Sequence, residues 1–337
     1  MNPTPTDDLS RNTEAVADSL STMIKKEFTS YSCCYDGYLD PSDPTMLTAA
    51  KRTQLVDWCY GVVDHCEFSR ETVASAMEMV DRFLSIPNST SDDAARVCDE
   101  ALRDESKLQL LTVTALYVSI KLNQKTVISS EQFSSEVCYR VYSAKEIEDI
   151  ERILLSGLSW RCHAPTAYQV GLSILSLLLP YVDIPEAQWG FLMDEMTYLT
   201  ELAVRDYYFS TQRASTIALA AILNVISDSN TKEPRRVLRA FLQVITESFD
   251  FEGSQQITSA RSRLKLLSRP VTEAEGDEIV DDERSSVAES VLTLKTFNGS
   301  SHQTRHLEEL NYVHGSPNSS LIDISFESRD SVCSFLC

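Results

Sequence analysis

The stretch LQLLTVTALYVSIK, residues Leu108–Lys121, decides the fold of this chain. It is apolar or small on nearly every face of a helix, and such a helix belongs in the middle of a bundle. The run stops at one lysine, Lys121, which must emerge at the surface. A central helix that ends in one exposed cation predicts a scaffold offering a charge to a partner, and it argues against a catalytic cleft.

Composition and charge limit the classes of partner. The 337 residues suffice for about two domains, and 43% hydrophobic residues are enough for real cores. The net charge is −20, with 30 Lys and Arg against 50 Asp and Glu, whereas nucleic-acid affinity depends on basic residues. The apolar runs are far shorter than the ~20 residues of a membrane span, and the N-terminus lacks a signal-peptide pattern. We therefore expect neither nucleic acid nor membrane as a partner.

The reactive residues show no pattern typical of an enzyme or a metalloprotein. Nine cysteines are scattered without CxxC pairs, which predicts small core residues in a reducing compartment and no zinc site. The sequence has no Gly-rich phosphate loop, nucleophile elbow or HExxH motif. We expect a protein that is not an enzyme, with no catalytic residues, no bound metal and no other cofactor.

Helical periodicity dominates from Leu47 to Leu267 and predicts an all-α protein. The first set of predicted helices contains residues 55–66, 69–84, 106–122, a short helix from Ser129 or Ser130, and 143–158, where Ser143 and Glu146 make a capping box. Residues 86–104 are predicted to be a polar connection with room for a short helical turn. The second set comprises 165–180, 186–205, 211–227, 234–248 and 254–268.

The two sets resemble each other, which predicts a duplicated architecture. DRFLS at 81–85 is echoed by DYYFS at 206–210, and each precedes a helix of small and apolar residues. We therefore predict two tandem five-helix bundles. The predicted organisation is an N-terminal arm at 1–46, a first bundle at 47–162, a second bundle at 163–269, and a disordered acidic tail at 270–337. Within the arm, residues 13–30 are predicted to form an extra amphipathic helix with Val16, Leu20, Ile24 and Phe28 inward.

Several ordered motifs resemble those of the cyclin family. In the first repeat these are KRTQLVDW (51–58), DRFLS (81–85), LQLL (108–111) with Lys121, KEI (145–147) with Glu151, and LSW (158–160). In the second repeat, YLTEL (198–202) and ASTIA (214–218) are similar to the C-terminal cyclin box. The resemblance covers roughly residues 47–267. It implies a regulatory subunit that activates a cyclin-dependent protein kinase in cell-cycle control, in the nucleus, the cytoplasm or both.

The resemblance also implies which residues meet the kinase. Lys121 and Glu151 would form the polar centre of the contact with the movable kinase helix. The apolar positions expected around this centre are Val118, Leu122, Leu155 and Trp160. After the lysine, many cyclins carry an aromatic residue and two glutamates, whereas this chain has Leu122, Asn123 and Gln124. The resemblance therefore does not say which kinase is preferred.

Two further sets of residues follow from the same resemblance. Arg52 and Asp81 are expected to form a structural ion pair that tethers the first two helices. The positions of a substrate-docking groove are Trp58, Leu108 and Gln109. Lys51 and Gln54 stand where apolar residues would line that groove, so we expect it to bind a hydrophobic docking peptide weakly.

The termini carry candidate control segments. Thr4 and Ser316 each precede a proline and are minimal sites for proline-directed phosphorylation. Residues 270–284 combine Pro, Thr, Glu and Asp, as in rapid-turnover segments, so ubiquitin-ligase machinery is an expected partner alongside kinase substrates and inhibitors.

Two alternative functions are compatible with the same fold. One is a transcription-associated cyclin, and the other is a cyclin-fold transcription factor, which the negative net charge argues against.

Overall fold

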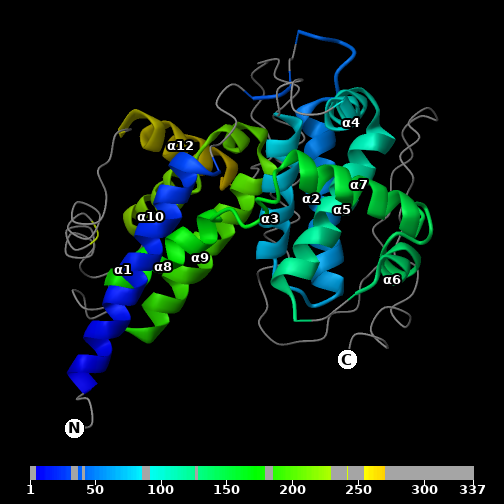
Figure 1. Ribbon diagram of the computed structural model, residues 1–337. Coiled ribbons are helices and arrows are strands. Elements are labelled where there is room, and N and C mark those ends of the chain that lie inside the picture. Colours follow the sequence, from blue (N-terminus) through cyan, green and yellow to red (C-terminus); the bar gives the residue numbers. More distant parts are fainter. Residues whose placement is uncertain are drawn as a thin grey trace, which may run out of the picture.

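The computed structural model describes residues 5–31, 37–39, 42–85, 92–125, 128–178, 185–228, 241 and 254–269. These residues form helices joined by turns and include no strand, so the all-α prediction is confirmed. Two helical bundles lie side by side (Figure 1). Within the described part of the chain, none of the helices combines the length and hydropathy of a bilayer-spanning segment.

The first bundle is built around a central helix, α5. Its elements are α2 (Ala49–His65), α3 (Glu71–Leu84), α4 (Asp92–Arg103), α5 (Glu105–Asn123), α6 (Ser130–Gln132) with a π-helical turn η1 (Phe133–Val137), and α7 (Ala144–Gly157). Every residue of α5 from Leu108 to Ile120 is buried, and α5 packs against α2, α3, α4 and α7. The apolar stretch therefore occupies the centre of the bundle, as its composition predicts.

Local capping sets where helices begin. The Ser143 hydroxyl accepts from the Glu146 N–H, and the Glu146 carboxylate accepts from the Ser143 N–H at 2.9 Å, which confirms the predicted capping box at α7. Asp104 begins α5, because its Oδ1 accepts from the Ser106 N–H at 2.8 Å. Such caps satisfy backbone donors that have no partner within the helix.

Helix α4 corrects the predicted polar connection at 86–104. Residues 92–103 form a 12-residue helix, in which Ala94, Val97, Cys98 and Ala101 are buried against the rest of the first core. Its sequence, DDAARVCDEALR, is polar on average, but its small apolar residues recur at helical spacing. The prediction failed because the segment is polar on average, whereas its few apolar residues form a narrow face of an amphipathic helix.

The second bundle consists of α8 (Ala167–Leu178), α9 (Glu186–Arg205), a 3₁₀ helix η2 (Tyr207–Thr211), α10 (Ala214–Asp228) and α12 (Ser254–Leu267). The two echoed segments differ in structure, because DRFLS closes α3 whereas DYYFS begins η2. Of the helix predicted at 234–248, the structure describes only Phe241, which is helical and buried in the second core. The tail predicted at 270–337 lies outside the described residues.

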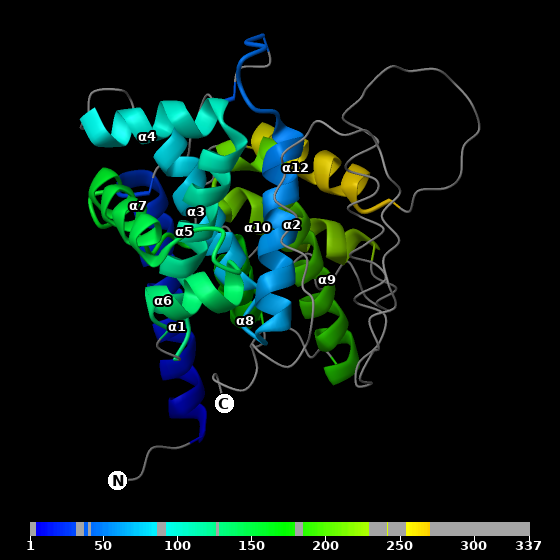
Figure 2. The same ribbon diagram turned by 90° about the vertical axis from the view of Figure 1, so that its right-hand side faces the viewer.

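The N-terminal helix α1 (Pro5–Thr29) packs on the second bundle along α8 (Figures 1 and 2). Leu20 is 1% exposed and belongs to the second core. The prediction that Phe28 faces inward is wrong, since its side chain is 55% exposed and the Arg213 guanidinium lies 4.0 Å from its ring centroid. The neighbouring residue Glu27 turns inward, where its carboxylate accepts from the Ser215 N–H and hydroxyl at 2.8 and 2.6 Å.

This contact explains why a carboxylate replaces the expected aromatic. Ser215 lies in the first turn of α10, where backbone N–H groups have no helical acceptor and the helix dipole favours an anion. Burial raises the pKa of Glu27, although its hydrogen bonds to Ser215 oppose the shift. Glu27 thus caps a helix of the second bundle from α1, which the local sequence pattern does not reveal.

Arg52 joins three helices at the boundary between the bundles. Its Nε and Nη2 donate to the two carboxylate oxygens of Asp81 at 2.8 and 2.6 Å, so α2 and α3 are tethered by a two-point ion pair. Its Nη1 donates to the backbone oxygen of Val204 at 2.7 Å, in the last turn of α9. The Tyr38 hydroxyl donates to Asp81 Oδ1 at 2.7 Å. Both charged side chains are buried, with 5% and 9% of their surface exposed.

Replacing Arg52 with Met is expected to lower the free energy of unfolding by ~3–5 kcal/mol, because Asp81 would remain buried without its cation. The measurement is urea unfolding followed by circular dichroism. Arg96→Met is the matched control, since Arg96 is 56% exposed on α4 and its ion pairs are worth ~0–1 kcal/mol. Equal losses for the two variants would contradict this role for Arg52.

Candidate partner-binding site

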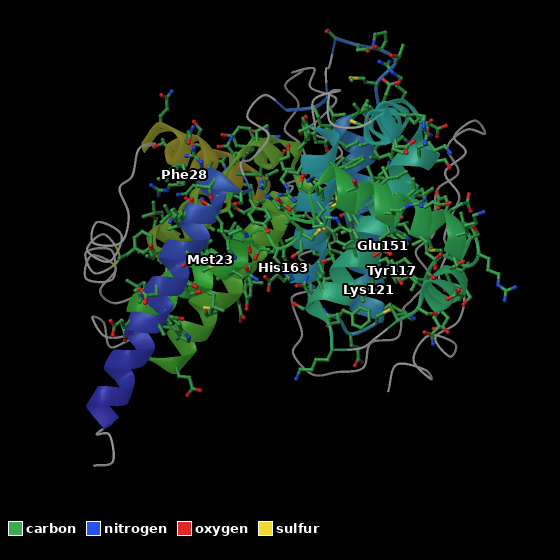
Figure 3. All side chains as sticks on the ribbon, viewed as in Figure 1. Met23, Phe28, Tyr117, Lys121, Glu151 and His163 are labelled. Carbon is green, nitrogen blue, oxygen red and sulfur yellow. The ribbon has the colours of Figure 1, made fainter. Side chains whose placement is uncertain are left out.

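The central helix delivers Lys121 to the surface at its last turn. The Lys121 side chain is 34% exposed, and its Nζ pairs with the Glu151 carboxylate on α7. The ammonium also lies 4.3 Å from the ring centroid of Tyr117, one helical turn earlier. Figure 3 shows these three side chains together on one side of the first bundle. The two charges predicted to form the centre of the site therefore lie in direct contact.

The pair is held in place before any partner arrives. Glu151 is 16% exposed, and α7 is anchored beneath it by the fully buried Leu154. The Tyr117 ring supports the ammonium through a cation–π contact. The sequence analysis does not predict a role for Tyr117 at this site. Its position four residues before Lys121 is the signal that places both side chains on one face of the helix. The result is a charge pair whose orientation is set by the bundle.

The end of α7 presents an exposed aromatic side chain on a constrained backbone. Ser159 and Trp160 have φ values of 53° and 61°, a left-handed conformation that is uncommon for residues other than glycine. The Trp160 N–H donates to the Leu155 backbone oxygen at 2.8 Å, which closes the helix. Trp160 is 74% exposed. Conformations of this kind cost ~1–3 kcal/mol each and cluster at functional sites.

The predicted apolar residues around the pair divide into two groups. Leu122 is 40% exposed and Leu155 is partly buried, so with Trp160 they offer apolar area to a partner. Val118 is only 2% exposed and cannot supply contact area, which corrects the prediction. It lies on the core side of α5, so its role is to support the surface from within.

The two residues after Leu122 are engaged inside the chain. The Asn123 side-chain amide donates to the Ser119 hydroxyl at 3.1 Å, and the Gln124 amide donates to the Thr72 hydroxyl at 2.8 Å. These amides therefore fasten the end of α5 to itself and to α3. They stand where many cyclins carry glutamates, so this part of the surface lacks that acidic character.

The predicted docking-groove residues do not line an open groove. Leu108 and Gln109 are 6% and 5% exposed, and the Gln109 side-chain oxygen accepts from the Tyr142 hydroxyl at 2.9 Å. Trp58 is partly buried against the first core. Lys51 pairs with Glu105 at 3.1 Å, so a charged bridge joins the starts of α2 and α5. The groove prediction is corrected for Leu108 and Gln109, whose side chains are covered.

Other predicted sites are limited by what the structure describes. Thr4 and Ser316 lie outside the described residues. Among the residues that are described, no group of three or more His, Cys, Asp or Glu side chains is arranged to hold a metal ion. His163 is exposed in the segment that joins the bundles, and in the view of Figure 3 it lies between Met23 of α1 and Lys121.

Comparisons with known proteins agree with this fold. The family model described as "Cyclin, N-terminal domain" matches residues 18–163. Residues 18–163, which contain the whole first bundle, are a cyclin N-terminal domain. It is 24% identical over 220 residues to Cyclin-D3-1 of Arabidopsis thaliana, a match covering 64% of this chain and 51% of that protein. It is 26% identical over 179 residues to putative cyclin-A3-1 of the same plant, covering 52% and 44% of the two chains.

The match to solved structures supports the same fold. A viral cyclin from herpesvirus saimiri superposes with a TM-score of 0.52 at 14% identity, over 73% of this chain and 96% of the viral chain. The chain spans about half the length of the curated relatives it matches. The comparisons therefore show a cyclin N-terminal domain and a cyclin-like fold, and leave the partner to be argued from the surface.

Replacing Lys121 with Met is expected to change the free energy of unfolding by less than ~1 kcal/mol, because a partly exposed ion pair contributes little to stability. Urea unfolding of the variant and the parent protein measures this difference. A loss of ~3 kcal/mol or more, as expected for Arg52→Met, would show that Lys121 is a structural residue.

Proposed function

We propose that this cyclin is a non-catalytic regulatory subunit that binds and activates a cyclin-dependent protein kinase. The observation that carries the proposal is the Lys121–Glu151 pair at the end of the central helix, beside three accessible apolar side chains. A preformed charge pair with an apolar surround suits a protein partner, because it combines orientation with area removed from water.

The physical mechanism follows from what a protein kinase needs. Its catalytic lysine must pair with a glutamate on a movable helix, and its activation loop must be held open. A rigid surface that binds only the helix-in arrangement shifts the population towards the active state. The packed core beneath α5 and the fixed end of α7 supply this rigidity, since neither Lys121 nor Trp160 stands on a loose loop.

The charge pair should matter more in the complex than in the free protein. In the free cyclin the pair is partly solvated, so its contribution to stability is small. A bound kinase would cover both side chains, and truncating a desolvated, hydrogen-bonded charge costs ~2–5 kcal/mol of binding free energy. This contrast separates a binding role from a folding role.

The proposed setting is cell-cycle control in the nucleus, the cytoplasm or both. Support comes from the similarity to proteins named as D-type and A-type cyclins. The alternative of a transcription-associated kinase partner uses the same surface, and a panel of kinases distinguishes the two. A DNA-binding role is disfavoured by the net charge of −20. Ubiquitin-ligase recognition through residues 270–337 remains part of the proposal.

The double substitution Lys121→Ala with Glu151→Ala is expected to weaken kinase binding by at least ~30-fold and to reduce activation in parallel. A panel of purified cyclin-dependent kinases is mixed with the full chain, and both affinity and phosphorylation of a peptide substrate are measured. The matched control is Arg96→Ala with Glu100→Ala, which removes an exposed ion pair on α4.

Three outcomes decide the matter. Selective loss in the Lys121 and Glu151 variant, with circular dichroism unchanged, supports both the function and the interface. Normal activation by that variant refutes the interface. Failure of the unmodified chain to bind or activate every kinase in the panel refutes the proposed function itself.

A further inference from the structure

A second site lies between the two bundles, away from the Lys121–Glu151 pair. It is a cavity of about 350 Å³ bordered by α3 of the first bundle, α9 and the start of α10 in the second, the end of α1, and the linker after α7. This volume lies within the range of small-ligand pockets. No part of the kinase-binding proposal uses this cavity.

Polar groups in the cavity wall are left without partners. Among the described residues, nothing forms a hydrogen bond with the Tyr60 hydroxyl, although Tyr60 is 2% exposed and its hydroxyl is buried. The same holds for the Ser210 hydroxyl and for Glu78 Oε2. The Glu78 side chain is 26% exposed to solvent, but its Oε2 atom is buried. Buried polar groups are normally hydrogen-bonded, so these three atoms have hydrogen-bonding capacity that the described part of the chain does not use.

The charged side chains in the cavity wall indicate whether a ligand would be an anion or a cation. Five carboxylates and four guanidinium groups line the cavity. The guanidinium groups are already engaged: Arg52 with Asp81, Arg70 with Asp64 and Glu201, Arg82 with Glu78 Oε1, and Arg213 over the Phe28 ring. An anion would have to compete with these contacts. A cation would meet the unpartnered oxygen of Glu78 and offset the surplus negative charge.

The rest of the cavity wall is apolar and would suit the aliphatic part of a ligand. Small and apolar side chains of α3, the linker and α8 border the cavity, among them Ala74, Met77, Ala164, Pro165 and Ala167. Thr166, in the same linker, donates to Glu71 at 2.9 Å and so holds the linker against α3. The cavity therefore combines an acidic acceptor and a free hydroxyl with apolar surface.

We propose that the cavity between the bundles binds an organic cation, namely a primary ammonium or guanidinium group on a short aliphatic chain. The cationic group pairs with the Glu78 carboxylate, and a second polar atom of the ligand meets the Tyr60 hydroxyl, once small side-chain shifts open these covered oxygens to the cavity. The same chemistry is carried by free alkylamines and by the lysine or arginine side chain of a partner protein, and the experiment below distinguishes these sources.

Binding should depend on pH near neutrality. Burial raises the pKa of the Glu78 carboxyl to about 7, outweighing the lowering by Arg82. The other titratable or charged groups that line the cavity are Arg52 and Tyr60 on α2, Arg70 before α3, Glu71, Asp81 and Arg82 on α3, Glu27 and Tyr31 at the end of α1, Tyr168 on α8, Glu201 on α9, and Arg213 before α10. Cys162 in the linker also interacts electrostatically with Glu78. Because the cation prefers the ionised carboxylate, apparent affinity should fall about tenfold from about pH 8 to about pH 6.

The test is a titration of the full chain with n-butylammonium or n-butylguanidinium in phosphate buffer, followed by NMR. 1-Butanol is the neutral control of matched shape. We expect saturable binding of the cations with low-millimolar dissociation constants, and much weaker binding of the alcohol. N-acetyl-lysine amide and N-acetyl-arginine amide form the second arm. If they bind as tightly as the free cations, the occupant is a partner's side chain, whereas binding of the free cations alone indicates a small molecule.

Variants link binding to the named atoms. Glu78→Gln should weaken cation binding at least tenfold and abolish its pH dependence. Tyr60→Phe removes only a hydroxyl without a partner, so the fold is retained, and binding should weaken about fivefold. Glu100→Gln, an equal change of charge on the exposed face of α4, should have no effect. Equal binding of 1-butanol, unchanged binding to Glu78→Gln, or no saturable cation binding would overturn the proposal.

Discussion

The buried guanidinium of Arg52 is the constraint on which the arrangement of the two bundles depends. It satisfies both oxygens of Asp81 on α3 and the Val204 carbonyl at the end of α9. A buried charge is tolerated only when its hydrogen bonds are made, so the three helices must meet at one point. Thr53, the next residue, donates to the Arg205 carbonyl at 3.0 Å and strengthens the same joint. Arg52 and Thr53 thereby tie the end of α9 in the second bundle to α2 and α3 in the first.

The boundary between the bundles is more polar than either core. Besides Arg52, it contains the Arg70–Glu201 pair at 3.0 Å and the Arg205–Asp57 pair at 2.9 Å. Charged contacts of this kind fix direction and register, whereas apolar packing mainly contributes area. The same polarity leaves a cavity whose wall is not fully satisfied by the chain itself. The proposed cation site and the joint are thus two consequences of one charged boundary.

The surface proposed to bind a kinase follows a different principle, because it depends on the apolar core. Helix α5 is buried along thirteen consecutive residues, and Lys121 emerges only where that burial ends. Its partner Glu151 is placed by α7, whose cap at Ser143 and left-handed end at Trp160 define both limits of that helix. A partner therefore meets charges whose orientation was determined when the core packed. This is the property that a subunit acting by population shift requires.

The sequence by itself determined the all-α class, the central place of Leu108–Lys121 and the capping box at Ser143, because periodicity and capping are local properties. The motif order also indicated which residues to pair, as with Arg52 and Asp81. Only the tertiary structure decided that residues 92–103 form a packed helix, that Glu27 and not Phe28 turns inward, and that Val118 is covered. A local pattern defines a face of a helix, but neighbouring helices decide which face is buried and which polar groups find partners. The unpartnered hydroxyl of Tyr60 is such a case, since it depends on residues far apart in the chain.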